Sequence, residues 1–257
     1  MTFFPLDGSG CARKNLLLAP NPLGLGPFRH VILDSFSHGS RLSEAQRLRG
    51  RIALQEEAIH PGQLDAAGRH VQAADRDSWH LLSLDCNGRI AGCLRYRPHE
   101  GKAQFENLTI SRSALAHSKT WGGKLRAAVE ADLLHARRRG CSYVELGGWV
   151  IEEALRCTTE AVRMIATAFA FAQLCGGALG ISMASTRRCS SAILKRIGGQ
   201  CLQAGGVELP SFYDAQYRCH MEILRFDSTN SNPRYRRWME VCRLHLHDVP
   251  VICPEAP

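Results

Sequence analysis

Hydrophobic and polar residues repeat with two different periods along this chain, and these periods predict a mixture of strands and helices. Between residues 143 and 199 the pattern changes repeatedly and predicts strand, helix, strand and helix in turn. Residues 158–174 are apolar on every side of a helix, which is typical of a helix that is mostly buried. Residues 179–183 form a short apolar run typical of a buried strand. The fold class is therefore predicted to be α/β.

The remaining elements follow from turn signals and apolar spacing. Residues 79–97 predict a β-hairpin because Asn87-Gly88 separates two apolar runs. Apolar residues at helical spacing predict helices over 42–57 and 121–139, and Gly140 ends the second. Further expected elements are strands at 28–36, 105–110 and 217–226, a short helix at 187–197, and a last helix that Asn232-Pro233 opens.

The domain organisation is expected to be simple. A chain of 257 residues with 45% hydrophobic content can bury one substantial core. Residues 1–27 are rich in proline and glycine without a period, which predicts a loosely ordered lead-in. The main domain is expected at 28–226, with 103–140 as a possible insertion, and 227–257 as a C-terminal helical extension.

The strand expected at residues 143–150 carries the strongest chemical signal. It holds one acid, Glu145, followed closely by Gly147 and Gly148. Glycine weakens a strand interior, so such a pair is typical of a bulge or of a close approach by ligand or backbone. A bulge frees N–H groups that could hold the oxygen of an acyl group under attack. Glu145 is then a candidate base for an attacking amine, and a structural salt bridge is the alternative.

Composition narrows the partners. The net charge of +8 and the pI near 9.1 favour an acidic or phosphate-bearing partner. Aromatic residues make up 7% and do not interleave with the basic runs, which disfavours nucleic acid. No apolar run reaches the roughly 20 residues of a membrane span, and the first residues lack the order of a secretory signal, so a cytoplasmic protein is expected. Eleven cysteines without a Cys-x-x-Cys pair predict neither a disulfide framework nor a metal site.

Several segments together resemble one known superfamily. They are Asp75-x-Asp77-Ser78-x-His80-Leu81-Leu82, Gly88–Arg95, Cys189–Gly198 and Pro210–Tyr213. With the order of elements, these segments resemble the GNAT acyltransferases, and within them the N-acyl amino acid synthases and the acyl-homoserine-lactone synthases. The resemblance covers about Leu42 to Phe226. It implies the GNAT fold, a mixed central sheet flanked by helices, and transfer of an acyl group to an amine.

The resemblance also implies roles for individual residues. Glu145 falls on the strand where many GNAT enzymes place a general base, and Trp149 fits an aromatic that the lactone synthases have there. The backbone of Gly147, Gly148 and Val150 would hold the oxyanion and the donor's arm. The phosphates of an acyl-phosphopantetheine donor would lie near helix starts, at Arg156, Thr158, Thr159, Ala161, Arg187 and Ser190.

Three departures from the family pattern refine this picture. Thr159 replaces the first glycine of the pyrophosphate loop, which favours the phosphopantetheine of an acidic acyl carrier protein over coenzyme A. Leu194 stands where GNAT enzymes often place a tyrosine acid, so that role is vacant or moves to Tyr213 or Tyr217. The arginine that follows the glutamate in lactone synthases does not appear after Glu145, which disfavours that activity.

The sequence therefore predicts an N-acyltransferase that moves a fatty acyl group from a carrier-protein or coenzyme A thioester to an amine of an amino acid or peptide. The alternatives are an acyl-homoserine-lactone synthase and a non-catalytic basic module that binds a carrier protein or nucleic acid. Glu106 is the rival base, provided that residues 105–110 form the catalytic strand.

Overall fold

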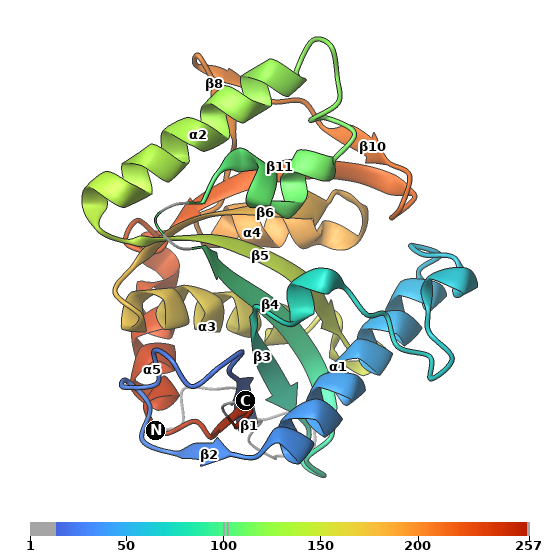
Figure 1. Cartoon of the computed structure of the whole chain (residues 1–257), viewed down its shortest axis with the longest axis vertical. Coiled ribbons are helices and arrows are strands. Elements are labelled where there is room, and N and C mark those ends of the chain that lie inside the picture. Colours follow the sequence, from blue (N-terminus) through green and yellow to red (C-terminus); the bar gives the residue numbers. More distant parts are fainter. Residues whose placement is uncertain (1–13, 100, 102, 256–257) are drawn as a thin grey trace.

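One large mixed sheet crosses the molecule (Figure 1). The structure is a computed structural model that describes residues 14–99, 101 and 103–255. In spatial order the strands of this sheet are β10 (Phe212–Asp214), β11 (Cys219–Asp227), β6 (Ala178–Ser185), β5 (Ser142–Ile151), β4 (Ile90–His99), β3 (Trp79–Leu84), β1 (Lys14–Leu18), β12 (Val251–Cys253) and β2 (Val31–Leu33). Strand β7 (Gln200–Cys201) pairs with β11, and β8 (Gln203–Ala204) pairs with β9 (Val207–Glu208).

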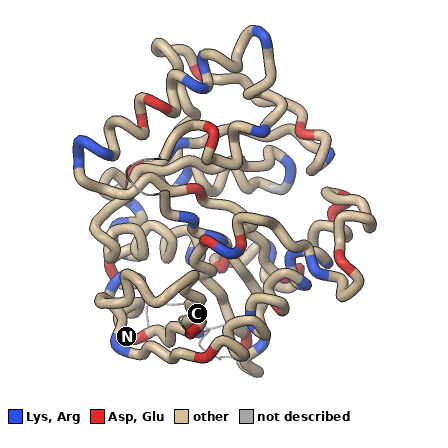
Figure 2. Tube along the Cα trace, in the orientation of Figure 1, with Lys and Arg blue, Asp and Glu red and all other residues tan. Residues whose placement is uncertain are grey.

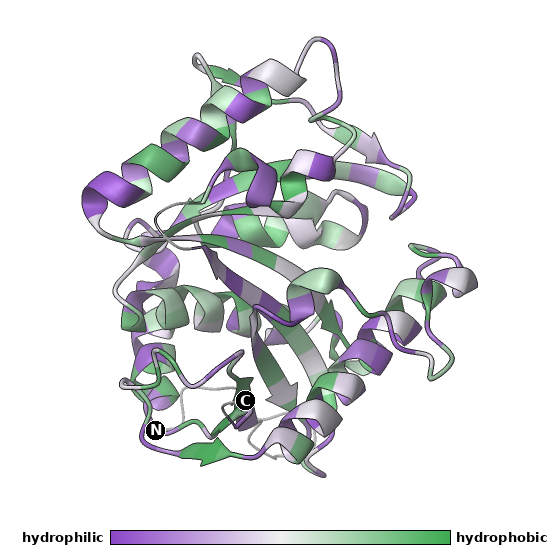
Figure 3. Ribbon diagram, viewed as in Figure 1, coloured by the Kyte–Doolittle hydropathy of each residue, from purple (hydrophilic) through white to green (hydrophobic). Residues whose placement is uncertain are grey.

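Helices cover both faces of the sheet. On one face α1 (Ser35–Gln55) packs on β4 and β5, while α2 (Gly122–Arg139) packs on β5 and β6. On the other face α3 (Glu160–Leu174) packs against α4 (Ser190–Ile197) and α5 (Arg236–Leu246). Short 3-10 turns lie at Pro61–Gln63, Ala73–Asp75, Phe105–Asn107, Thr109–Arg112, Glu153–Leu155, Arg187–Cys189 and Pro233–Tyr235. Helices α1 and α2 show hydrophilic bands along their length in Figure 3, as expected for helices with one face in water.

Local sequence signals explain where the long helices begin and end. Helix α1 begins earlier than its apolar spacing predicts, because the Asp34 carboxylate accepts a hydrogen bond of 2.9 Å from the Ser37 N–H and caps the helix. Helix α2 ends as predicted at Gly140, whose φ of 65° is left-handed. The β3–β4 hairpin also forms as predicted, with Gly88 at a φ of 76° in its turn.

The two ends of the chain belong to the sheet, contrary to expectation. Residues 14–18 form strand β1 between β3 and β12, so the predicted lead-in is wrong for them, and residues 1–13 lie outside the described part. Leu16–Leu18 are buried there, and burying these leucines offsets the cost of ordering the strand. The segment 227–257 is more than a helical extension, because its strand β12 pairs with β1 and β2.

The strand predicted at residues 105–110 is wrong, since this segment forms two 3-10 turns. Its polar side chains bond to the nearby backbone: the Asn107 side chain accepts 2.7 Å from the Gln104 N–H, and the Ser111 hydroxyl donates 2.7 Å to the Leu108 carbonyl. Such local bonds compete with a strand ladder. The possible insertion 103–140 instead covers the sheet, with Phe105 and Leu108 in a core cluster under α2.

Helix α3 is the buried helix that the sequence predicts. Its small residues Ala166, Ala168, Ala170 and Ala172 are at most 1% exposed and belong to the main core cluster. They therefore pack closely against their neighbours in the core.

Candidate functional site

Strands β5 and β6 run parallel and then part. Their pairing starts at Ser142–Ala178 and ends at Leu146–Ser182. Beyond that point β5 continues to Ile151 paired with β4, while β6 continues to Ser185 paired with β11. The strands therefore diverge toward their carboxyl ends, which is where ligands bind in many α/β sheets.

Glu145 lies just before this divergence, on the face that α1 and α2 cover. Its buried carboxylate accepts 2.6 Å from the Thr109 N–H at Oε1, and lies 2.9 Å from His99 Nε2 at Oε2. Arg97 Nη1 lies 3.6 Å from the same Oε2. The acid predicted from the sequence is thus held by three neighbours, two from β4 and one from the 3-10 turn at Thr109.

The predicted bulge in β5 is present. The register shifts between the pairs Cys93–Val150 and Arg95–Gly147, so two residues of β5 oppose one of β4. Gly148 has a φ of 57°, which favours glycine. A bulge lets successive residues point to the same face of the sheet.

Two arginines lie over the glycine pair. A Cβ atom on Gly148 would come within 3.0 Å of Arg49 Nη1, and one on Gly147 within 3.3 Å of Arg95 Nη2. The close approach that the glycines predict is therefore made by guanidinium groups from α1 and β4.

Asp75 binds both arginines and completes a set that we call the arginine cluster: Arg49, Asp75 and Arg95. Arg49 Nη2 is 2.6 Å and Arg95 Nη1 3.0 Å from the carboxylate. Burial by itself raises the pKa of Asp75, but the two guanidinium groups hold it well below its usual range. Two cations on one anion leave the cluster with a net positive charge. Arg49 Nη1 and Arg95 Nη2 donate no hydrogen bond to the described residues.

Neither arginine is a site residue predicted from the sequence, although the position of Arg49 carries a signal. It stands four residues after Ala45 and three before Ile52, on the apolar face of the predicted helix. A charged residue there is buried and must be paired. His80 next to the cluster is a structural histidine: its Nε2 lies 3.0 Å from the Asp75 carbonyl, and burial lowers its pKa to about 4.

The predicted phosphate-binding arginines come together where β5 and β6 part toward their carboxyl ends, a place that we call the mouth between β5 and β6. Arg156 Nη2 is 2.6 Å from the Glu56 carboxylate, and Arg187 Nη1 donates 3.1 Å to the Glu56 carbonyl. Thr158 is occupied locally, since its hydroxyl donates 2.7 Å to the Leu155 carbonyl. Thr159 is the N-cap of α3.

The other predicted positions lie around this mouth or on its walls. Ala161 is buried in the first turn of α3, and Ser190 is half-buried at the start of α4. Trp149 is half-buried against the main core, and Val150 packs on the α1 side of the sheet.

Backbone strain concentrates at the same place. In the described part of the chain, positive φ angles outside glycine occur at Glu57 (54°), Cys157 (59°), Cys189 (65°) and Arg218 (49°). These residues lie in the loops after α1, β5, β6 and β10, and the hydrogen bonds of neighbouring residues join the loops to one another. Strain of this kind clusters at functional sites.

Of the two candidate tyrosines, the structure brings Tyr217 to the site. Its hydroxyl accepts 2.9 Å from Gln72 Nε2, and the Gln72 carbonyl accepts a bond of 2.5 Å from Arg95. Tyr213 is 53% exposed on the edge strand β10, where its ring packs against His220. Its neighbour Phe212 faces the core under α2, so Tyr213 points to the opposite face from Glu145.

Glu106 is not on a strand and does not reach this site. It lies on an exposed 3-10 turn and forms an ion pair with Arg126. Its own backbone N–H and then Arg126 lower its pKa, which makes it a weaker base. The structure therefore separates the rival acids, and of Glu106 and Glu145 it places Glu145 beside the bulge.

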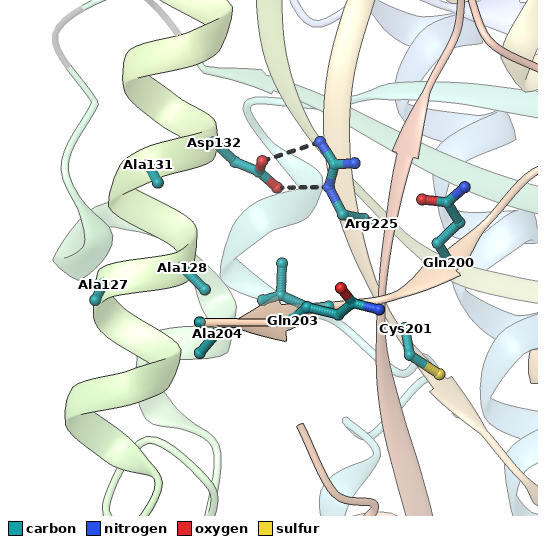
Figure 4. Close-up of a pocket in the computed structure, with 11 residues that line it drawn as sticks. Ala127, Ala128, Ala131, Asp132, Gln200, Cys201, Gln203, Ala204 and Arg225 are labelled. Carbon is teal, nitrogen blue, oxygen red and sulfur yellow. Dashed lines mark hydrogen bonds and ion pairs between the residues drawn. The ribbon is translucent and has the colours of Figure 1, made fainter. Parts of the chain in front are cut away.

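Hollows exist elsewhere on the molecule. One of about 400 Å³ lies between α2 and the β7–β8 region, bordered by small residues of α2 and by the Asp132–Arg225 ion pair (Figure 4). Lys and Arg are distributed around the whole trace (Figure 2).

Among the described residues no group of three or more acidic, cysteine or histidine side chains is placed to hold a metal ion. None of the described helices has the length and apolar character to cross a membrane.

Comparison with known proteins identifies the fold. No family model and no curated protein matches the sequence. Solved structures do match: the CoA-dependent acyl-homoserine lactone synthase BjaI with SAM and isopentyl-CoA is 15% identical with a TM-score of 0.57, covering 96% of this chain and 95% of BjaI. The CoA-dependent acyl-homoserine lactone synthase MesI is 13% identical with a TM-score of 0.50, covering 95% and 100%. FeeM, an N-acyl amino acid synthase from uncultured soil microbes, is 8% identical with a TM-score of 0.48, covering 91% and 99%.

The likenesses to BjaI and MesI confirm the predicted fold class. The chain has the GNAT acyltransferase fold, a mixed sheet flanked by helices.

Proposed function

We propose that this protein is an N-acyltransferase that moves a fatty acyl group from a phosphopantetheine thioester to the amine of an amino acid. The observation that carries the proposal is the position of Glu145. In a GNAT fold, this buried acid stands beside a β5 bulge at the point where β5 and β6 part.

The chemistry follows from this position. Glu145 takes a proton from the ammonium group of the acceptor, and the free amine attacks the thioester carbon. A C–N bond forms, and the C–S bond breaks. N–H groups of Gly147–Val150 that face β6 lie past the last β5–β6 pair and can hold the oxyanion. Tyr217 can protonate the leaving thiolate, and the second proton of the attacking amine then restores the tyrosine.

The arginine cluster supports an acceptor that carries a carboxylate. Arg95 pairs with Gly147, two residues from Glu145 on the same face of the sheet. Its Nη2, together with Arg49 Nη1, offers donors with positive charge, and arginine suits a carboxylate because both are planar. A free amino acid could thus place its carboxylate at the cluster and its amine toward Glu145.

The mouth supports a donor with phosphate. Arg156 and Arg187 both reach the end of α1 there, and α3 begins two residues after Thr158. Thr159 in place of the family's glycine favours the single phosphate of a carrier protein's phosphopantetheine over the pyrophosphate of coenzyme A.

The test compares the protein with its Glu145→Gln variant, both expressed in bacteria and assayed in purified form. Mass spectrometry of lipid extracts should detect N-acyl amino acids from the parent. Release of thiol from acyl carrier protein or acyl-CoA should fall about 10²-fold or more in the variant, as for loss of a general base. Glu106→Gln is the matched control and should retain activity, because Glu106 is exposed and its carboxylate pairs with Arg126.

Each other outcome contradicts part of the proposal. Lactones formed in the presence of S-adenosylmethionine would identify a homoserine-lactone synthase instead. Full activity of Glu145→Gln would remove the assigned base. Unchanged extracts and no thiol release with any donor would favour a binding module without catalysis.

A further inference from the structure

The proposed reaction must dispose of one proton in each cycle. An ammonium acceptor loses two protons when it becomes an amide, and the leaving sulfur keeps one of them. The other stays on the base until it reaches solvent. Glu145 is buried, so this proton needs a route out. This requirement rests on the proposed function, because the proton is released only if the protein transfers an acyl group to an amine.

The groups around Glu145 differ in what they can do with a proton. Thr109 contacts the carboxylate through its backbone N–H, at 2.6 Å, and through its hydroxyl, which donates at 3.3 Å. The N–H only donates, and a neutral hydroxyl is far too weakly basic to take up and hold the proton. Arg97, at 3.6 Å, stays protonated at all accessible pH values. His99 has its Nε2 at 2.9 Å from Oε2, and a neutral imidazole can accept a proton there. Among these described contacts, His99 is thus the one able to receive the proton.

His99 also borders a second hollow. This pocket of about 390 Å³ is lined by His99, Tyr143, Leu133, Ala136 and Arg137, among others. It lies at the start of β5, since His99 pairs with Tyr143, whereas the mouth between β5 and β6 lies at the other end. The imidazole therefore contacts the base and lines a pocket on the side away from the mouth.

We propose that His99 relays the proton of Glu145 to solvent in this pocket. His99 with its proton on Nδ1 accepts the carboxyl proton at Nε2, which regenerates the Glu145 carboxylate. The imidazolium then releases the Nδ1 proton to water, and exchange with solvent restores the first tautomer. No bond other than those to the proton changes, and no oxidant or reductant is needed.

The charged groups around His99 are the Glu145 carboxylate on β5, Arg97 on the same strand as His99, and Arg137 on α2. The remaining titratable groups that line the pocket are Cys141 and Tyr143. Burial raises the pKa of Tyr143 well above its usual value, so it stays neutral.

The experiment uses His99→Gln and His99→Ala in the full-length protein. Glutamine can still donate a hydrogen bond to Glu145 but cannot carry a proton, so kcat should fall about 10²-fold with little change in KM. Alanine leaves space beside the pocket, so imidazole added to the buffer should restore at least about tenfold of the lost kcat in His99→Ala. Imidazole should not restore Glu145→Gln.

The control is His135→Ala, because His135 is exposed on α2 and lies outside the relay. This variant should keep the wild-type kcat, and added imidazole should not change it. A His99→Gln kcat within twofold of wild type would overturn the relay. So would a folded His99→Ala that imidazole does not accelerate, with circular dichroism reporting the fold. No turnover by the wild-type protein would instead overturn the proposed function, and the relay with it.

Discussion

Two buried charged networks lie on opposite sides of the sheet, and they differ in how completely the nitrogens of their arginines are hydrogen-bonded. On the α3 side, the Glu160 carboxylate accepts 2.9 Å from Arg163 Nε and 2.6 Å from Nη2. Arg163 also donates 3.0 Å to the Ser83 hydroxyl and 2.8 Å to the Asn15 side chain. All three side-chain nitrogens of Arg163 donate hydrogen bonds, so this arginine has no nitrogen left to bind a further group.

The arginine cluster on the α1 side has two cations for one anion. Arg49 Nη1 lies over Gly148 and Arg95 Nη2 over Gly147, and within the described part of the chain neither nitrogen donates a hydrogen bond. A saturated network fixes the packing of the elements it joins, here β1, β3 and α3. An unbalanced one beside a bulge and an acid has capacity for an anion. We therefore assign a structural role to the first and a binding role to the second.

The largest expected effect tests the structural role. Arg163→Met should lower the free energy of unfolding by about 3–5 kcal/mol, because Glu160 would lose a buried ion pair and its carboxylate would stay buried. Urea denaturation followed by circular dichroism measures this. The double variant Arg163→Met, Glu160→Gln is the control and should recover much of the loss. A loss below about 1 kcal/mol would refute the assignment.

The second effect is the pH dependence of folding stability caused by His80, which lies next to the arginine cluster. His80 has a folded pKa of about 4 against 6.5 for an ordinary histidine, because burial disfavours its charge. The unfolded chain therefore binds the proton more tightly, and stability is complete above pH 6.5 and falls as the pH drops toward 4. The loss across this window should be about 3 kcal/mol.

Urea denaturation at pH 7 and at pH 4.5 checks this, with His80→Gln as the control that should reduce the dependence. Burial also lowers the pKa of His38 and of His70, so part of the dependence should remain. The depressed pKa of Asp75 acts at lower pH, since its contribution is present above pH 4 and is lost below it. Equal pH slopes for the parent and His80→Gln would show that another group is responsible.

The smallest effect distinguishes Gly148, which lies at the β5 bulge, from Gly39 in α1. Gly148→Ala places a Cβ 3.0 Å from Arg49 Nη1 at a left-handed φ, and should cost about 1–2 kcal/mol of stability. It should also raise the acceptor KM, because Arg49 must move. Gly39→Ala in α1 meets no atom within 4 Å and should add about 0.5–1 kcal/mol. Thermal unfolding and steady-state kinetics measure both variants, and equal shifts would mean that Gly148 has no special contact.

Much of the fold was predictable because it depends on local patterns. The Asn87-Gly88 turn, the apolar helix α3 and the glycine end of α2 each follow from a few neighbouring residues. The strand expected at 105–110 was wrong because side chains there bond to their own backbone. Strands β1 and β12 were missed because three to five residues carry too little pattern, and their partners are far away in sequence.

The candidate site divides in the same way. The sequence by itself determined that a lone acid precedes a glycine pair in a strand, since residue type and position suffice for that. Only the tertiary structure decided that Arg49 and Arg95 fill the space over those glycines, that Tyr217 and not Tyr213 reaches this side of the sheet, and that His99 touches Glu145. These contacts join segments far apart in the chain, and they depend on strand register and the closing of loops, which no short stretch of sequence encodes.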